Sequence, residues 1–126
     1  MGKKKVLLVD DEVDLLTLMR KIVSFWGYEV FTASCGDEAL DFLRNERIDA
    51  IVLDYSMPDI DGIELAKKIR TKGYRVPVIM FTAKPSIKTI EAAKGLQIVA
   101  FIPKITPSED TLEDLKVTLD LACRGA

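Results

Sequence analysis

Short apolar runs alternate with longer segments of helical periodicity along the whole chain, and this alternation limits the possible folds more than any other feature. The first run, residues 6–9, reads Val-Leu-Leu-Val and is followed at once by three acidic residues. An unbroken apolar run of this kind is typical of a strand buried on both faces, as in a parallel sheet covered by helices. The strands expected on this basis are 6–9, 28–31, 50–53, 78–81 and 99–102.

The segments between these runs carry apolar residues at the spacing of amphipathic helices. Gly27 is expected to end the first helix and Ser34 to cap the second. Residues 106–109, Thr-Pro-Ser-Glu, have capping-box spacing with proline at the first helical position. The expected helices are 13–26, a segment from Ser34 to Leu43, 60–69, 87–94 and a last one reaching about Cys123.

Five strands alternating with five helices over short loops predict an α/β domain with a doubly wound, mostly parallel sheet. Right-handed crossovers favour the flavodoxin-like strand order 2-1-3-4-5. A chain of 126 residues is long enough for one core without disulfides or a structural metal. We therefore expect a single domain over 1–126, with its core at about 5–123.

The composition excludes several function classes. The chain has no histidine, which rules out His-dependent triads, His general bases and His-ligated zinc. Its net charge of −2 argues against direct nucleic-acid binding, and no run approaches the roughly 20 apolar residues that span a membrane. Cys35 and Cys123 lie far apart without CxxC spacing, so we expect reduced thiols and a cytoplasmic location.

Polar side chains follow the expected strands where the strands end. The acidic residues 10–12 follow the first strand and Asp54 follows the third, while Thr82 and Lys104 follow the fourth and fifth. In this topology ligands bind beyond the carboxyl ends of the strands, where the strand order reverses. These side chains are therefore expected to converge on one edge of the sheet.

Three of these side chains are carboxylates that repel one another. A pair of charges 4 Å apart costs about 4 kcal/mol at the effective dielectric near a protein surface. A hard divalent cation would remove this repulsion between Asp10, Asp11 and Asp54, and an all-oxygen site with few protein ligands suits Mg²⁺. With the Lys104 ammonium and the Thr82 hydroxyl added, the site has the groups needed for phosphoryl transfer.

Four segments, taken in order, resemble the response-regulator receiver domain of two-component signalling, the CheY-like family. They are Val-Leu-Leu-Val-Asp-Asp-Glu at 6–12, Leu-Asp-Tyr-Ser-Met-Pro-Asp-Ile-Asp-Gly at 53–62, Phe-Thr-Ala at 81–83 and Phe-Ile-Pro-Lys at 101–104. The separations also match the family: 43 positions from Asp11 to Asp54, 28 on to Thr82 and 22 on to Lys104. The resemblance covers essentially the whole chain.

The resemblance implies a role for each matching residue. Asp54 would accept a phosphoryl group from the phosphohistidine of a sensor histidine kinase or phosphotransfer protein. Asp11 and Asp54 would ligate Mg²⁺ directly, Asp10 through water and Ser56 through its backbone carbonyl. Lys104 would pair with a phosphoryl oxygen. Such a domain catalyses only its own phosphorylation and dephosphorylation.

The resemblance also implies a switch. Thr82 would move toward the phosphoryl group and Phe101 would turn inward, which would remodel the face of the fourth helix, fifth strand and fifth helix. A downstream effector protein would bind there, with the domain a monomer or a weak dimer on phosphorylation and with no membrane partner. Ser56 and Lys84 would flank the phosphoryl group and tune its lifetime.

Two positions depart from the family pattern. Ile105 follows Lys104 where the family usually has proline, often after a cis bond. A cis bond before a non-proline residue costs about 2.5–4 kcal/mol, so this bond is expected to be trans. Gln97 and Ile98 stand where a Gly-Ala pair is usual, which predicts a reshaped end of the helix at 87–94.

Parts of the sequence also suit other structures and functions. Taken alone, the acidic residues at 10–12 suit the start of a helix, and Thr82 suits the end of a strand. Lys104 suits a solvated loop, and Phe101 suits core packing. A haloacid-dehalogenase-type phosphatase needs a second aspartate where this chain has Ser56. A flavodoxin-like FMN site needs a Ser/Thr/Gly-rich loop after the first strand, where this chain has Asp-Asp-Glu. The sequence contains no Gly-Lys-Ser run, which excludes a nucleotide-binding phosphate loop. The main alternative is a degenerate receiver that docks a partner protein without phosphorylation.

Overall fold

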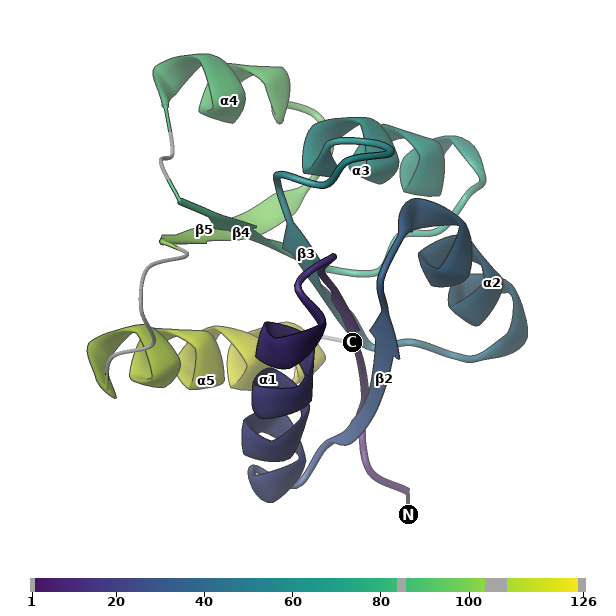
Figure 1. Cartoon of the computed structure of the whole chain (residues 1–126). Coiled ribbons are helices and arrows are strands. Elements are labelled where there is room, and N and C mark those ends of the chain that lie inside the picture. The colour runs from purple at the N-terminus through teal and green to yellow at the C-terminus, as the bar shows by residue number, and fades with distance from the viewer. Residues whose placement is uncertain (1, 84–85, 104–108, 125–126) are drawn as a thin grey trace.

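The protein, described by a computed structural model over residues 2–83, 86–103 and 109–124, contains one parallel five-stranded sheet in the order β2-β1-β3-β4-β5 (Figure 1). The strands are β1 (Lys5–Val9), β2 (Glu29–Ala33), β3 (Ala50–Asp54), β4 (Val78–Thr82) and β5 (Ile98–Pro103). The helices are α1 (Val13–Phe25), α2 (Gly36–Asn45), α3 (Gly62–Thr71), α4 (Ile87–Ala92) and α5 (Glu109–Arg124). The predicted doubly wound α/β fold and strand order are thus confirmed.

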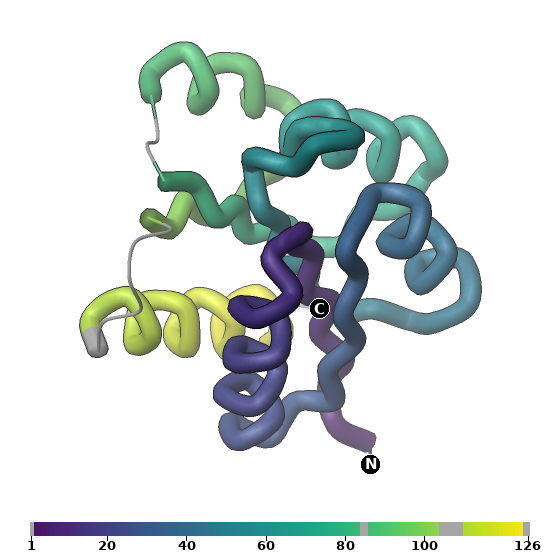
Figure 2. The backbone as a smooth tube through the Cα atoms, in the orientation of Figure 1, coloured from purple at the N-terminus to yellow at the C-terminus, as the bar shows by residue number. Residues whose placement is uncertain are grey.

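Helices cover both faces of the sheet. The backbone trace places α1 and α5 on one face and α2, α3 and α4 on the other (Figure 2). Side chains of β1 show how alternation fills both layers: Leu7 and Val9 pack into the α2/α3 core, whereas Val6 and Leu8 pack into the α1/α5 core. All four are at most 3% exposed, which explains why this strand reads as a continuous apolar run.

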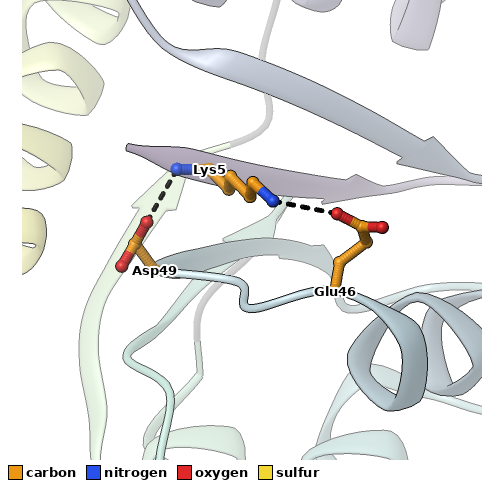
Figure 3. A network of polar contacts seen from close by, with 3 residues as sticks. All are labelled: Lys5, Glu46 and Asp49. Atoms are coloured by element: carbon orange, nitrogen blue, oxygen red, sulfur yellow. Dashed lines mark hydrogen bonds and ion pairs between the residues drawn. The ribbon is translucent and has the colours of Figure 1, made fainter. Parts of the chain in front are cut away.

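The start of β1 is held by a polar network (Figure 3). The backbone N–H of Lys5 donates to Asp49 Oδ2 at 2.8 Å, and Lys5 Nζ lies 3.0 Å from Glu46 Oε1. The Glu46 carboxylate raises the pKa of Lys5 above its ordinary value. These contacts extend β1 back to Lys5, one residue before the apolar run begins.

The predicted cap of α2 is wrong. Cys35, not Ser34, occupies the N-cap position, and it makes no side-chain cap hydrogen bond. Ser34 instead donates both its backbone N–H and its hydroxyl to Glu38 Oε1, each at 2.7 Å. The carboxylate reaches back one turn, so the serine hydroxyl acts as a donor to a charge rather than as an acceptor for the helix.

Other element ends shift by one to two residues from the sequence-based prediction. Helix α3 begins at Gly62 because Asp61 is extended and its carboxylate accepts the Glu64 N–H at 2.8 Å. Strand β2 begins at Glu29, after Tyr28. Helix α4 ends at Ala92, two residues early, and a turn leads to Gln97, whose φ of 58° lies in the left-handed region. The capping residues 106–108 lie outside the described residues, and α5 begins at Glu109.

A buried tyrosine joins the start of β2 to α5. The Tyr28 hydroxyl donates to Asp120 Oδ1 at 2.5 Å, and Lys116 Nζ lies 3.0 Å from Asp120 Oδ2. Burial and the Asp120 contact raise the pKa of Tyr28 above its ordinary value of 10.0. The Tyr28 hydroxyl and Lys116 hold the pKa of Asp120 below its ordinary 3.8.

Tyr28→Phe is expected to lower the free energy of unfolding by about 1–2 kcal/mol at neutral pH, because a hydrogen bond to a charged acceptor is lost. Since the folded pKa of Tyr28 is raised and that of Asp120 is lowered, the difference from wild type should be full between about pH 4 and pH 10. It should shrink as the pH rises above 10 or falls below 4. Urea denaturation across this range measures it.

Lys116→Met is the control for this prediction. It removes only an exposed i,i+4 ion pair with Asp120, which is expected to contribute less than about 0.5 kcal/mol. Equal effects of Tyr28→Phe and Lys116→Met would contradict the assignment of a strong buried hydrogen bond to Tyr28.

Candidate phosphoacceptor and metal site

Three aspartates meet at the carboxyl edge of the sheet. Asp10 and Asp11 directly follow β1, and Asp54 is the last residue of β3, the neighbour of β1 with Val9 opposite Leu53. One carboxylate oxygen from each aspartate lies within 4.8 Å of the other two. The structure therefore brings together the three carboxylates that the sequence analysis singled out.

Two of the three carboxylates are buried. Asp10 is 5% exposed and Asp54 is 2% exposed, whereas Asp11 is exposed. Backbone groups orient the buried pair: the Glu12 N–H donates to Asp10 Oδ1 at 2.9 Å, and the Ser56 N–H donates to Asp54 Oδ1 at 3.2 Å. Two charged carboxylates buried side by side oppose folding unless a positive charge lies beside them. A bound cation would supply that charge.

The loop after β3 folds back so that the start of α3 lies against the end of β3. The Tyr55 N–H donates to the Phe81 carbonyl at 2.8 Å, and the Gly62 N–H donates to the Tyr55 carbonyl at 2.7 Å. A Cβ at position 62 would lie 2.9 Å from the Asp54 carbonyl oxygen and 2.9 Å from Tyr55 Cα. Only glycine lets the start of α3 approach Asp54 this closely.

Two residues of this loop were missed by the sequence analysis. Asp59 accepts the Gly36 N–H at 3.2 Å through Oδ2, which ties the loop to the start of α2. Asp61 caps α3, and its sequence signal was available, because Asp61 and Glu64 have N-cap spacing. Asp59 carries no such signal, since its partner lies 23 positions away.

The remaining predicted residues are placed as follows. Thr82 ends β4, is 4% exposed and pairs with Pro103 of β5, one position beyond the Asp54–Phe81 pair. Phe101 lies opposite Met80 and packs, partly buried, against the α2/α3 core. Ser56 is exposed beside Asp54. Lys84, Lys104 and Ile105 lie outside the described residues.

The donor set has a clear chemical preference. Three carboxylates with no sulfur or imidazole ligand favour a hard divalent cation. The buried Asp54 carboxylate could serve as an oxygen nucleophile, and the buried Thr82 at the end of the neighbouring strand β4 could supply a hydroxyl donor. This combination suits chemistry on a phosphoryl group.

Comparison with known proteins assigns the family. The family model described as "response regulator receiver domain" matches residues 6–116. The chain belongs to this family. Receiver domains are the components of two-component signalling to which the sequence resemblance pointed.

Individual relatives agree with this assignment. The chain is 37% identical over 117 residues to the response regulator MprA of Mycobacterium sp. (strain KMS), covering 91% of this chain and 50% of that protein. It is 46% identical over 97 residues to the alkaline phosphatase synthesis transcriptional regulatory protein PhoP of Bacillus subtilis (strain 168), covering 77% and 40%. The chain thus spans about half the length, or less, of the curated relatives it matches.

Solved receiver structures share the fold. A CheY-like receiver domain protein from Methanospirillum hungatei JF-1 superposes with a TM-score of 0.85 at 30% identity, covering 99% of this chain and 100% of that one. The response regulator TrrA from Thermotoga maritima, solved in complex with Mg²⁺-BeF, gives a TM-score of 0.77 at 30% identity, covering 91% and 98%. No helix in the described part of the chain is both long and apolar enough to cross a bilayer.

Proposed function

We propose that this receiver domain accepts a phosphoryl group on Asp54 from the phosphohistidine of a sensor histidine kinase or phosphotransfer protein, in a Mg²⁺-dependent reaction in the cytoplasm. The observation that carries the proposal is the meeting of the Asp10, Asp11 and Asp54 carboxylates within 4.8 Å at the carboxyl edge of the sheet. The similar TrrA structure, a complex with Mg²⁺-BeF, supports the choice of metal.

The residues of this chain have distinct roles in the proposed reaction. A carboxylate oxygen of Asp54 attacks phosphorus, the bond from phosphorus to the histidine nitrogen breaks, and its electron pair leaves with the imidazole. Asp11, Asp54 and the Ser56 carbonyl would ligate Mg²⁺ directly and Asp10 would do so through water, and the bound ion would neutralise phosphoryl charge. Lys104 pairs with a phosphoryl oxygen.

The signal is read out through a change in the surface. In this proposal Thr82 moves toward the phosphorylated Asp54, and Phe101 turns inward to fill the space it leaves. Phe101 is only partly buried and lies on the edge strand, where a ring can reorient with little disturbance of the sheet. The face formed by α4, β5 and α5 then binds a downstream effector protein.

Intact mass measurement tests the acceptor function. Incubation with acetyl phosphate and Mg²⁺ is expected to add one phosphoryl mass, and EDTA added beforehand is expected to abolish the gain, because the carboxylates then repel the incoming phosphate. Mg²⁺-dependent binding of beryllofluoride is the second readout, since a short-lived adduct escapes mass measurement. Failure of both would replace this proposal with the alternative of a docking module that works without phosphorylation.

A further inference from the structure

Arg70, in the last turn of α3, donates hydrogen bonds to four backbone carbonyls in two separate connections. In the connection from α3 to β4, Nη1 reaches the carbonyls of Tyr74 at 3.0 Å and Val76 at 2.8 Å. In the turn before β5, Nε reaches the Leu96 carbonyl at 2.8 Å and Nη2 reaches the Gln97 carbonyl at 3.4 Å. One half-buried side chain therefore links α3 to the entries of two strands.

The chemistry of this contact makes it strong. A guanidinium presents five N–H donors in a rigid plane, and hydrogen bonds from a charged donor are stronger than neutral ones. Among the described residues no carboxylate pairs with Arg70, so its charge is directed at carbonyl dipoles. Burial and the nearby Arg75 lower the pKa of Arg70 from its ordinary 12.5, yet arginine stays protonated at neutral pH.

Leu96 and Ile98 pack against the α2/α3 core at the entry of β5, but the backbone pairing of this entry is irregular. Strand β5 is at the edge of the sheet, and among the described strands it pairs with β4 alone. Val78 lies opposite Ile98 and Ile79 lies opposite Ala100, so Val99 is an extra residue that interrupts the ladder. Gln97, just before it, holds a φ of 58°, which is strained for a residue with a side chain.

The opposite end of α3 lies at the acceptor. Gly62, its first residue, donates to the carbonyl of Tyr55, the neighbour of Asp54. Helix α3, between α2 and α4 in Figure 1, therefore connects the acceptor strand to the entry of β5 as one rigid element. Phe101 follows that entry on the same strand and packs against the α2/α3 core.

We propose that Arg70 is a positioning residue that clamps the entry of β5 to α3 and so holds Phe101 in its resting position. The clamp restrains the switch, and its removal makes the activated conformation easier to reach. The effect on activation rests on the proposed function, whereas the clamp itself does not.

Arg70→Met tests the clamp, with Arg44→Met as the matched control. Arg44 is an exposed arginine paired only with Asp41 on its own helix, among the described residues. In the resting protein, amide exchange over 96–101 should be at least about tenfold faster in Arg70→Met, because the charge-assisted bonds that close this segment are lost. Unchanged exchange over 96–101, or the same change in Arg44→Met, would overturn the proposal.

Beryllofluoride titration with Mg²⁺ tests the restraint on switching. Arg70→Met is expected to bind about 3–10-fold more tightly than wild type, because a contact that favours the resting state opposes activation by its full differential free energy. Arg70→Lys, which keeps the charge without the planar fork, should fall between the two. Wild-type affinity in Arg70→Met would show that Arg70 supports the fold alone. If wild type itself binds no beryllofluoride, the proposed function fails, and the exchange measurement still decides the clamp.

Discussion

Asp54→Asn is expected to abolish phosphoryl uptake from acetyl phosphate. The amide is nearly isosteric, and its oxygen still accepts the Ser56 N–H that orients Asp54 Oδ1, so the fold is preserved. An amide oxygen is a far weaker nucleophile than a carboxylate oxygen, and the substitution also removes one of the three carboxylate charges proposed to bind Mg²⁺. Intact mass after incubation with Mg²⁺ and acetyl phosphate is the measurement.

The control for this substitution is Asp14→Asn. Asp14 is an exposed carboxylate in the first turn of α1 and is not part of the three-aspartate cluster. It should leave phosphoryl uptake at the wild-type level. A phosphoryl adduct retained in Asp54→Asn would move the acceptor to another residue, and peptide mapping of that adduct would identify it.

The second large effect is expected at Gly62. A Cβ there would meet Met80 Sδ at 2.7 Å and the Asp54 carbonyl oxygen at 2.9 Å, so Gly62→Ala must push the start of α3 away from β3. We expect a loss of about 2–3 kcal/mol in the free energy of unfolding, the usual cost of overpacking a tight contact. Phosphoryl uptake should slow as well, because the same clash presses on the backbone of Asp54 and Tyr55. Urea denaturation and the time course of the intact mass measure the two effects.

Gly36→Ala provides the matched control, since Gly36 is the first residue of α2 as Gly62 is of α3. A Cβ at position 36 would meet Ile60 Cγ2 at 2.9 Å, which is a methyl group of a partly exposed side chain rather than a backbone atom. We expect this variant to lose less than about 1 kcal/mol, because alanine's higher helix propensity offsets part of the crowding. Equal losses at the two glycines would contradict the close approach of α3 to Asp54.

The fold was largely predictable because its signals are local. Each central strand is buried on both faces, so its apolar run is unbroken and easily recognised, as in β1 and β3. Parallel strands end at the same edge of a sheet, so the order β2-β1-β3-β4-β5 was enough to place Asp10, Asp11 and Asp54 together. The family resemblance named the same residues independently.

The errors came from polar groups with more than one available partner. Ser34 was predicted to cap α2, but the Glu38 carboxylate takes both of its donors. Helix α4 ends at Ala92 rather than at residue 94, and the turn that follows is bound through Leu96 and Gln97 by an arginine of another helix. The apolar periodicity of α4 does not predict this contact with Arg70.

The sequence by itself determined the layers, the strand order and the edge where the aspartates meet, because local periodicity reveals the strands and helices and right-handed crossovers restrict how they can be connected. Only the tertiary structure decided which distant groups touch: Tyr28 with Asp120, 92 positions apart, and Arg70 with Leu96, 26 positions apart. In the sequence Arg70 is simply a basic residue at a helix end, where the helix dipole alone would explain it. Its hydrogen-bond partners are backbone carbonyls, and every residue has one. Because no local sequence pattern distinguishes these carbonyls from others, only the packing of the whole chain decides which of them Arg70 contacts.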